Sequence, residues 1–282
     1  MAQEFNREEF DRLAGEFRYV ITDMICRAGS GHLGGALSLV EIMITLYWRV
    51  MNIDPSNPKW EDRDRLVLSK GHAGPVSYVS LAYRGFFPKT MLKTLNEDGT
   101  RLPSHMDRLL TPGVDMTAGS LGQGLSAACG MALAAKLDGR KHEVFCIIGD
   151  GESNEGQVWE AAMFGGHKKL DNLIAICDYN KLQIDGFTDD VLTLEPLADK
   201  WRAFNWEVME MDGHDWDDIY ETINRAKEVT GKPVMILAHT IKAKGHSIVE
   251  NKPESHNIKV DDQAAYDKYM DALDKKDYSL PY

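Results

Sequence analysis

The second half of the sequence alternates between short apolar segments and amphipathic helical segments, which leaves few possible architectures. Apolar runs rich in β-branched residues occupy positions 143–148, 173–178, 206–211 and 233–240. Segments with helical spacing lie near 156–169, 195–204 and 215–228. Because strands alternate with helices, we predict an α/β fold: a doubly wound, mainly parallel sheet with helices on both faces.

The first half is expected to add helices and one more strand. Apolar residues at helical spacing predict a helix over 7–27, and RLVLS at 65–69 resembles a strand. A further helix is expected from Ser38, with Glu41 completing a capping box. Small residues predict a closely packed helix over 120–139, and the charged stretch near 260–276 predicts a peripheral helix. We expect one domain over 1–282.

Composition excludes several classes of protein. The chain has 282 residues, of which 43% are hydrophobic, which suits a globular protein with a sizeable core. The net charge of -12 and the absence of a basic stripe argue against nucleic acid as a partner. No apolar run reaches the roughly 18 residues of a membrane span, and the N-terminus resembles no signal peptide. The four cysteines lack metal-site spacing, so we expect reduced thiols in a cytoplasmic protein.

A glycine-rich acidic turn, GDGESNEG at 149–156, directly follows the strand expected at 143–148. Asp150 is at its centre, and Asn180, 180 − 150 = 30 residues later, follows the next expected strand. Ligands of such sheets bind beyond the carboxyl ends of the strands. A carboxylate and an amide oxygen there can converge on Mg²⁺, and Gly151 lets a diphosphate approach the backbone.

The pairing of GDG with a later asparagine resembles the fingerprint of thiamin diphosphate enzymes. The stretches SGHLGG, LSKGHAG, LPSH, GSLGQG, GDGESNEG and NKLQIDG occur in the order found in the transketolase family. This resemblance covers roughly residues 20–260. It corresponds to the N-terminal, diphosphate-binding domain of a transketolase, and it implies that family's thiamin diphosphate-binding fold.

The resemblance implies a metal site and a cofactor site. Mg²⁺, for which Ca²⁺ or Mn²⁺ can substitute, would be bound by Asp150, Asn180 and the backbone carbonyl of Leu182. The implied contacts to thiamin diphosphate are His72, Gly119, Ser120, Leu121, Gly151, Glu152, Asn180, Ile184 and His256. The loop at 119–121 would present a helix N-terminus to the diphosphate. Ile184 would pack near the thiazolium ring, although an ordinary core position is an open alternative.

Four histidines would have catalytic roles in such an enzyme: His32, His72, His105 and His256. By resemblance, they line the channel to the reactive carbon, hold sugar hydroxyls and transfer protons. We expect structural roles for His142, His167, His214 and His239. The role of His246 is open, as are those of Lys242 and Lys244, for which a solvated loop is favoured over the site entrance.

Two glutamates after the turn, Glu155 and Glu160, have two possible roles. In the transketolase family such residues meet across the dimer as a buried acid network linking two active sites. A carboxylate at the start of a helix is also stabilised by the helix dipole without any partner. Both interpretations stay open.

The resemblance also implies a partner chain. A full transketolase continues into a pyrimidine-binding domain whose glutamate helps to deprotonate the cofactor, and into a third domain. The printed sequence ends at Tyr282. We therefore expect a heterotetramer with a separate C-terminal subunit, and no activity from this chain alone. The reaction implied is transfer of a two-carbon ketol unit from a ketose phosphate to an aldose phosphate, as in the pentose phosphate pathway.

Three other functions agree with parts of the pattern. One is a subunit of another thiamin diphosphate enzyme, similar to 1-deoxyxylulose-5-phosphate synthase or to the α chain of a 2-oxoacid dehydrogenase. The histidines favour transketolase, since sugar hydroxyls need such partners. Another is a non-catalytic thiamin diphosphate-binding subunit. The last, an unrelated nucleotide-binding domain, is disfavoured because neither GxGxxG nor GxxxxGK[ST] is present.

Overall fold

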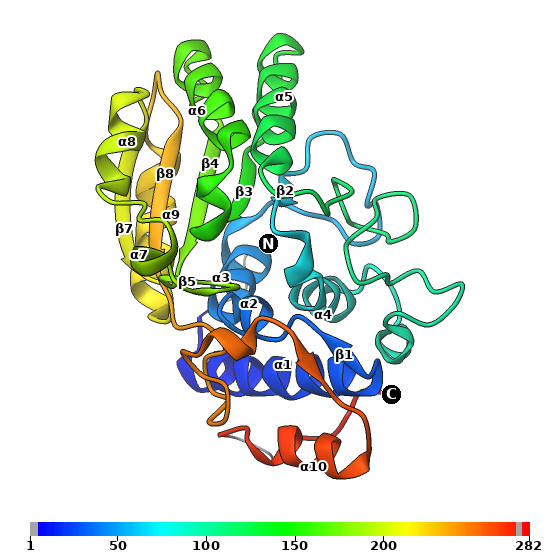
Figure 1. Cartoon of the computed structure of the whole chain (residues 1–282). Helices are drawn as coiled ribbons and strands as arrows, with labels where there is room; N and C mark the ends of the chain where they lie inside the picture. The colour runs from blue at the N-terminus through cyan, green and yellow to red at the C-terminus, as the bar shows by residue number, and fades with distance from the viewer. Residues whose placement is uncertain (1–4, 275–277) are drawn as a thin grey trace.

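A parallel five-stranded sheet forms the centre of the computed structural model, which describes residues 5–274 and 278–282 (Figure 1). Its order is β2-β3-β4-β8-β7. The strands are β2 (Arg65–Leu68), β3 (Val144–Gly149), β4 (Leu173–Tyr179), β7 (Glu207–Asp212) and β8 (Val234–His239). All four strand pairs are parallel, so the predicted doubly wound α/β architecture is confirmed.

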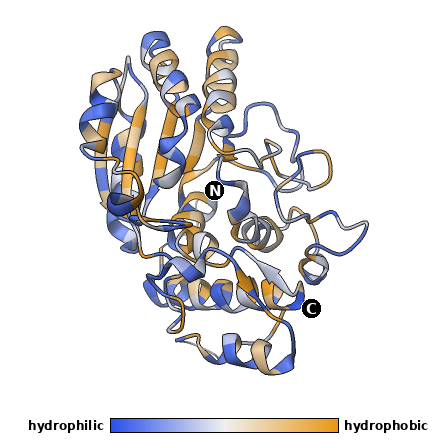
Figure 2. Ribbon diagram, in the orientation of Figure 1, coloured by the Kyte–Doolittle hydropathy of each residue, from blue (hydrophilic) through white to orange (hydrophobic). Residues whose placement is uncertain are grey.

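Helices cover both faces of this sheet because the strand residues are apolar on both sides. One face packs against α5 (Gln123–Leu137), α6 (Gly156–Lys168) and α8 (Leu197–Ala203). The other packs against α1 (Arg7–Arg27), α3 (Val40–Thr45), α4 (Gly74–Arg84) and α9 (Trp216–Lys227). In β3, Val144 and Cys146 enter the first core, whereas Phe145 and Ile147 enter the second. Figure 2 shows these strands as mainly hydrophobic.

The predicted capping box at Ser38 is wrong. A short helix α2 (Gly34–Leu37) precedes that residue, and α3 starts only at Val40. The Ser38 hydroxyl instead donates a hydrogen bond to Asp178 Oδ2, at 2.6 Å. The Glu41 carboxylate instead pairs with Arg18, at 2.7 Å. Both side chains make tertiary contacts that local sequence could not reveal.

Other elements differ from the sequence-based expectation at their ends. α5 begins at Gln123 instead of 120, because Gly122 before it adopts a left-handed φ of 80°. α4 and the hairpin of β5 (Leu182–Gln183) and β6 (Gly186–Phe187) were not predicted. After that hairpin comes a short helix, α7 (Thr188–Val191).

The C-terminal part returns to the first helix. α10 (Gln263–Asp271) lies beside α1, while residues 275 and 276 of the predicted 260–276 helix lie outside the described residues (Figure 1). Just before α10, β9 (Ile258–Lys259) pairs antiparallel with β1 (Ser30–Gly31). In the described ranges, no helix has the length and apolarity needed to cross a membrane. All four cysteines are free and buried, as expected.

Candidate active site at the carboxyl edge of the sheet

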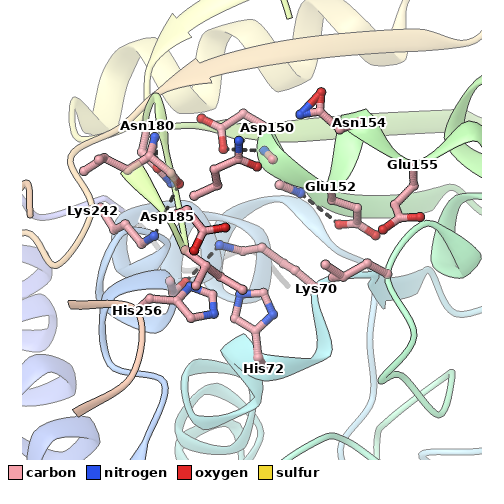
Figure 3. A pocket seen from close by; sticks show the side chains of 17 residues that line it. Lys70, His72, Asp150, Glu152, Asn154, Glu155, Asn180, Asp185, Lys242 and His256 are labelled. Atoms are coloured by element: carbon pink, nitrogen blue, oxygen red, sulfur yellow. Dashed lines mark hydrogen bonds between the residues drawn. The ribbon is translucent and has the colours of Figure 1, made fainter. Parts of the chain in front are cut away.

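A cavity of about 310 Å³ lies beyond the carboxyl ends of β3 and β4. Its walls come from separate parts of the chain: the GDG turn, the β5–β6 hairpin, the segment after β2, the loop after β8, Gly35 and the loop before α5 at Leu121. Figure 3 shows Asp150 and Asn180 on one side of this cavity and His72 and His256 on the opposite side, with Lys70 and Lys242 between them. The polar groups expected at the sheet edge therefore share one cavity.

Asp150 is held rigidly in the turn between β3 and the following 3₁₀ turn. Its Oδ1 accepts a hydrogen bond from the Gly151 amide at 2.7 Å, and its Oδ2 accepts one from the Lys181 amide at 2.5 Å. The side chain is 2% exposed. Burial, followed by the neighbouring Asp178 carboxylate, raises the pKa of Asp150 to about 7. A cation in the cavity would relieve this unfavourable burial of negative charge.

Asn180 and Leu182 contribute the other two predicted metal-ligand oxygens. The Asn180 side-chain oxygen accepts a hydrogen bond from the Leu182 amide at 3.0 Å, which fixes its direction. The Leu182 carbonyl accepts a hydrogen bond from Lys242 Nζ at 3.3 Å. Lys242 is 3% exposed and lines the cavity, so the solvated-loop interpretation of this lysine is wrong. An ammonium on Leu182 shows that this carbonyl is available to a cation.

The cavity fits a divalent cation and a diphosphate in its donor groups. Asp150, Asn180 and Leu182 offer only oxygen, the ligand that Mg²⁺ prefers. Gln183 Nε2 is buried in the cavity wall without a hydrogen-bond partner among the described residues, so a donor is free for an anion. A Cβ added at Gly151 would lie 2.9 Å from Gln183 Cβ, so glycine is needed there. The described residues contain no group of three or more His, Cys, Asp or Glu that could bind a metal.

The four predicted histidines come together. The His32 ring centroid lies 5.2 Å from that of His72, 5.7 Å from that of His105 and 5.2 Å from that of His256. His72 and His256 are 5.1 Å apart and both line the cavity. Four segments separated by up to 256 − 32 = 224 residues thus form one histidine cluster next to the predicted metal ligands.

Three rings of the histidine cluster, His32, His72 and His256, have lowered pKa values and are uncharged at neutral pH. Burial, followed by the nearby Lys70 ammonium, lowers the pKa of His72 to about 2. Burial and the charge of Lys242 lower the pKa of His256 to about 4. The pKa of His32 is also lowered, mainly by burial. Neutral imidazoles offer one donor and one acceptor each, which suits hydrogen bonding to sugar hydroxyls.

We expect this cluster to make the fold acid-sensitive. The depressed pKa values of His72 and His256 mean that below pH 6.5 the unfolded chain takes up protons that the folded chain does not. The free energy of unfolding should fall from pH 6.5 toward pH 4, by at most about 1.4 kcal/mol per pH unit and ring, less after solvent screening. Chemical denaturation at several pH values, in the wild type and in His72→Asn/His256→Asn, measures this slope.

The double variant should flatten the acid limb of that profile. His239→Asn is the matched control, because His239 is exposed on β8 and outside the cluster. An equally steep fall in the double variant would show that other groups cause the acid sensitivity.

A buried ion pair lies next to the cavity, and the sequence did not predict it. Lys70 Nζ pairs with Asp178 and also donates to the Gly35 carbonyl at 3.1 Å. Asp178 further accepts hydrogen bonds from Ser38 and Thr240. Burial alone would raise the pKa of Asp178, but Lys70 and these hydrogen bonds hold it below its usual value. The residues stand in the motifs SKGH and CDYN, so only their contact was unpredictable.

The other predicted cofactor-binding residues, besides His72 and His256, divide into two groups. Gly151, Glu152, Leu121, Asn180 and Ile184 line the cavity. Gly119 and Ser120 are exposed and are not among the described residues that line the cavity. The loop is nevertheless tied to the cavity, because Glu152 Oε1 accepts a hydrogen bond from the Gly122 amide at 2.8 Å. Glu152 therefore braces this loop.

Ile184 and the two predicted glutamates are exposed in this chain. Ile184 is 62% exposed at the cavity, so the alternative of an ordinary core isoleucine is wrong. Glu155 precedes α6 and also lines the cavity, without a side-chain cap to the helix. Glu160 is exposed on α6. Both interpretations of the two glutamates stay predictions.

The remaining histidines vary in their surroundings. His246 is fully buried, and neither ring nitrogen has a hydrogen-bond partner in the described part of the chain. His239 pairs with Glu210 at 2.8 Å on the surface. His214 is a half-buried partner of Glu41, at 3.1 Å. Lys244 is not among the described residues that line the cavity. Its backbone carbonyl accepts a hydrogen bond from Arg18.

Comparison with known proteins decides the family. The model of the transketolase thiamine diphosphate binding domain matches residues 10–276. The chain belongs to the transketolase family. It is 55% identical to the 6-deoxy-6-sulfo-D-fructose transketolase subunit SqwG of Clostridium sp. (strain MSTE9), over 89% of this chain and 91% of that protein. It is 41% identical to an apulose-4-phosphate transketolase subunit of Phocaeicola vulgatus, over 84% of each.

A solved transketolase shares the architecture. The enzyme of Campylobacter jejuni superposes with a TM-score of 0.88 at 33% identity, covering 95% of this chain and 43% of that one. This member of the transketolase family thus spans less than half the length of that enzyme, whereas it matches most of the two relatives named as subunits.

Proposed function

We propose that this chain is the N-terminal subunit of a two-chain transketolase and forms a single diphosphate-binding domain. One observation supports this best. The oxygen donors of Asp150, Asn180 and Leu182 lie at the same cavity as the four-histidine cluster. The two relatives named as transketolase subunits match over most of their length, which supports the same division for this chain.

The residues of one side of the cavity suit cofactor binding. Asp150, Asn180 and the Leu182 carbonyl would hold Mg²⁺, and the metal would in turn hold the diphosphate. Lys242 supplies positive charge toward that anion, and the Gln183 amide, which has no partner among the described residues, supplies a donor. Burial and Lys70 lower the pKa of Lys242 to about 8, so a bound anion would favour its charged form. Thiamin diphosphate, when bound, supplies the nucleophilic carbon and the electron sink for cleavage of a carbon–carbon bond.

The histidines on the other side suit substrate binding. The neutral rings of His32, His72 and His256, together with the neighbouring His105, can form hydrogen bonds with the hydroxyls of a ketose donor. They can also take a proton from a hydroxyl and return it, which ketol transfer requires at the donor and at the acceptor.

The partner completes the site in this proposal. A C-terminal subunit with a pyrimidine-binding domain would cover the cavity and supply the glutamate that helps to deprotonate the cofactor. Two copies of each chain would form a heterotetramer, in which Glu155 and Glu160 could meet their counterparts. The reaction would be transfer of a two-carbon ketol unit from a ketose phosphate to an aldose phosphate.

A second donor class is favoured by one finding. The 55% identical relative is named for 6-deoxy-6-sulfo-D-fructose, a ketose with a sulfonate at its far end. In this proposal the histidine cluster binds hydroxyls near the reacting carbon. It does not contact the far end of the sugar, so it does not distinguish phosphate from sulfonate. The same catalytic chemistry would therefore serve a sulfonated donor.

The decisive experiment is a ketol-transfer assay with thiamin diphosphate and Mg²⁺. This chain is assayed alone and then mixed with a candidate for the C-terminal partner chain, with fructose 6-phosphate and 6-deoxy-6-sulfofructose as parallel donors. We expect turnover only in the mixture, and the preferred donor identifies the class. Turnover by this chain alone would contradict the division of the site. If neither sample shows turnover with any donor or any candidate partner chain, the proposed reaction is overturned.

A further inference from the structure

The segment that carries Lys242 is held by its backbone on both sides of that lysine. On one side, the Ile241 amide donates a hydrogen bond to His214 Nε2 at 2.8 Å. On the other side, the Lys244 carbonyl accepts one from Arg18 Nε, also at 2.8 Å. These two bonds come from outside the cavity wall, whereas the Lys242 ammonium points into the cavity (Figure 3).

The two holding side chains are joined through one carboxylate. Arg18 Nη2 donates to both oxygens of Glu41, at 2.7 and 2.9 Å, and His214 Nδ1 lies 3.1 Å from Glu41 Oε2. Because His214 Nε2 accepts from Ile241, the ring proton must lie on Nδ1 and point to Glu41. Although burial opposes it, the charge of Arg18 and the contact of His214 lower the pKa of Glu41 to about 2. Glu41 therefore stays ionised and fixes the tautomer of His214.

The backbone between these two bonds does not adopt its conformation freely. Ala243 has a left-handed φ of 58°, a strained conformation for a residue with a side chain. Its amide donates to the Gly34 carbonyl at 3.0 Å, which joins the segment to the glycine loop after His32. A segment in this conformation needs contacts that outweigh its strain, and the two side-chain bonds are among them.

The three residues come from distant parts of the fold. Arg18 lies on α1, Glu41 on α3, and His214 in the turn between β7 and α9. Their side chains are only 11%, 9% and 13% exposed, so their ion pair and hydrogen bonds are shielded from water. None of the three is among the described residues that line the cavity, and their hydrogen bonds connect them to it through the backbone of 241–244.

We propose that Arg18, Glu41 and His214 are positioning residues that set the location of the Lys242 ammonium for the diphosphate. This inference rests on the proposed function, since it assumes a diphosphate in the cavity. The clamp, meaning these three side chains, keeps Lys242 beside the Leu182 carbonyl, at the junction of the metal ligands and the anion. Loss of the clamp should weaken diphosphate binding without removing any group that touches the ligand.

The test compares two substitutions of one residue. His214→Ala removes the acceptor for Ile241, whereas His214→Gln can place an oxygen near the position of Nε2. Calorimetric titration of the full chain with thiamin diphosphate and Mg²⁺ should show about tenfold weaker binding for His214→Ala, as for other supporting residues of a site. His214→Gln should recover most of it. Amide exchange at 241–244 should be faster in the alanine variant alone.

The controls separate positioning from folding. His239→Ala removes a histidine with a similar glutamate partner, exposed and outside the cavity, so it should leave affinity unchanged. If His214→Ala does not fold, Arg18→Lys takes its place, since lysine keeps the charge beside Glu41 but loses the Nε bond to Lys244. A lowered melting temperature with unchanged affinity in the folded variant would overturn the inference. Absence of thiamin diphosphate binding by the wild type, both alone and mixed with the partner chain, would instead overturn the proposed function.

Discussion

Replacement of Asp150 by asparagine should abolish useful binding of the cofactor while leaving the fold intact. The substitution exchanges a charged oxygen ligand for a neutral one of the same shape. We expect Mg²⁺-dependent affinity for thiamin diphosphate to fall by roughly two orders of magnitude, as when one partner of a buried charged contact is removed. Titration of the chain with the cofactor, with and without Mg²⁺, measures this loss.

Stability should move the other way. Because burial and Asp178 raise the pKa of Asp150 to about 7, its ionised form opposes folding above that pH when no cation is added. Asp150→Asn should therefore melt no lower than the wild type at pH 8 without Mg²⁺. The matched control is Asp185→Asn, which alters an exposed carboxylate of the same cavity and should keep most of the affinity. Equal binding by Asp150→Asn and the wild type would refute the predicted metal site.

Replacement of Lys70 by methionine should cause the largest loss of stability. The change leaves the fully buried Asp178 carboxylate without its cation, next to Asp150. Removing one member of a buried pair typically costs about 3–5 kcal/mol. For a chain of this size that corresponds to a fall in melting temperature of roughly 10 °C. Calorimetric melting measures it directly.

Two comparisons identify the cause of that loss. Lys136→Met breaks a partly exposed pair with Asp171, which should cost no more than about 1 kcal/mol. Adding Asp178→Asn to Lys70→Met removes the stranded charge, and stability should largely return. If the double variant were as unstable as Lys70→Met, lost packing and not the unpaired carboxylate would be responsible.

Sequence patterns predicted the parts of this fold that depend on local order. The apolar runs before Asp150 and before Asn180 identified two adjacent strands, and parallel strands necessarily place their carboxyl ends together. The meeting of His32, His72, His105 and His256, however, followed from the resemblance to transketolases and not from any spacing. Their separations along the chain contain no periodicity from which contact could be deduced.

What could not be predicted were contacts between side chains that are ordinary in their local context. Ser38 and Glu41 match a capping box, but Ser38 bonds to the buried Asp178 and Glu41 pairs with the half-buried Arg18 instead. His214 follows a strand in a sequence that resembles many turns, and only the structure shows that its ring holds the Lys242 segment. Lys242 itself stands in a polar run, KAKGH, which favours a solvated loop until tertiary contacts bury it.

The small ladder between β1 and β9 has a consequence for how the site is aligned. Ser30 pairs with Lys259 and Gly31 with Ile258. His32 directly follows the paired residues of β1, and His256 lies two residues before those of β9. A shift of this pairing by one residue would reverse the face on which the side chains of one strand lie. One of the two rings would then turn away from its neighbour. Two short stretches near opposite ends of the chain thus act as an alignment key for two substrate-facing groups.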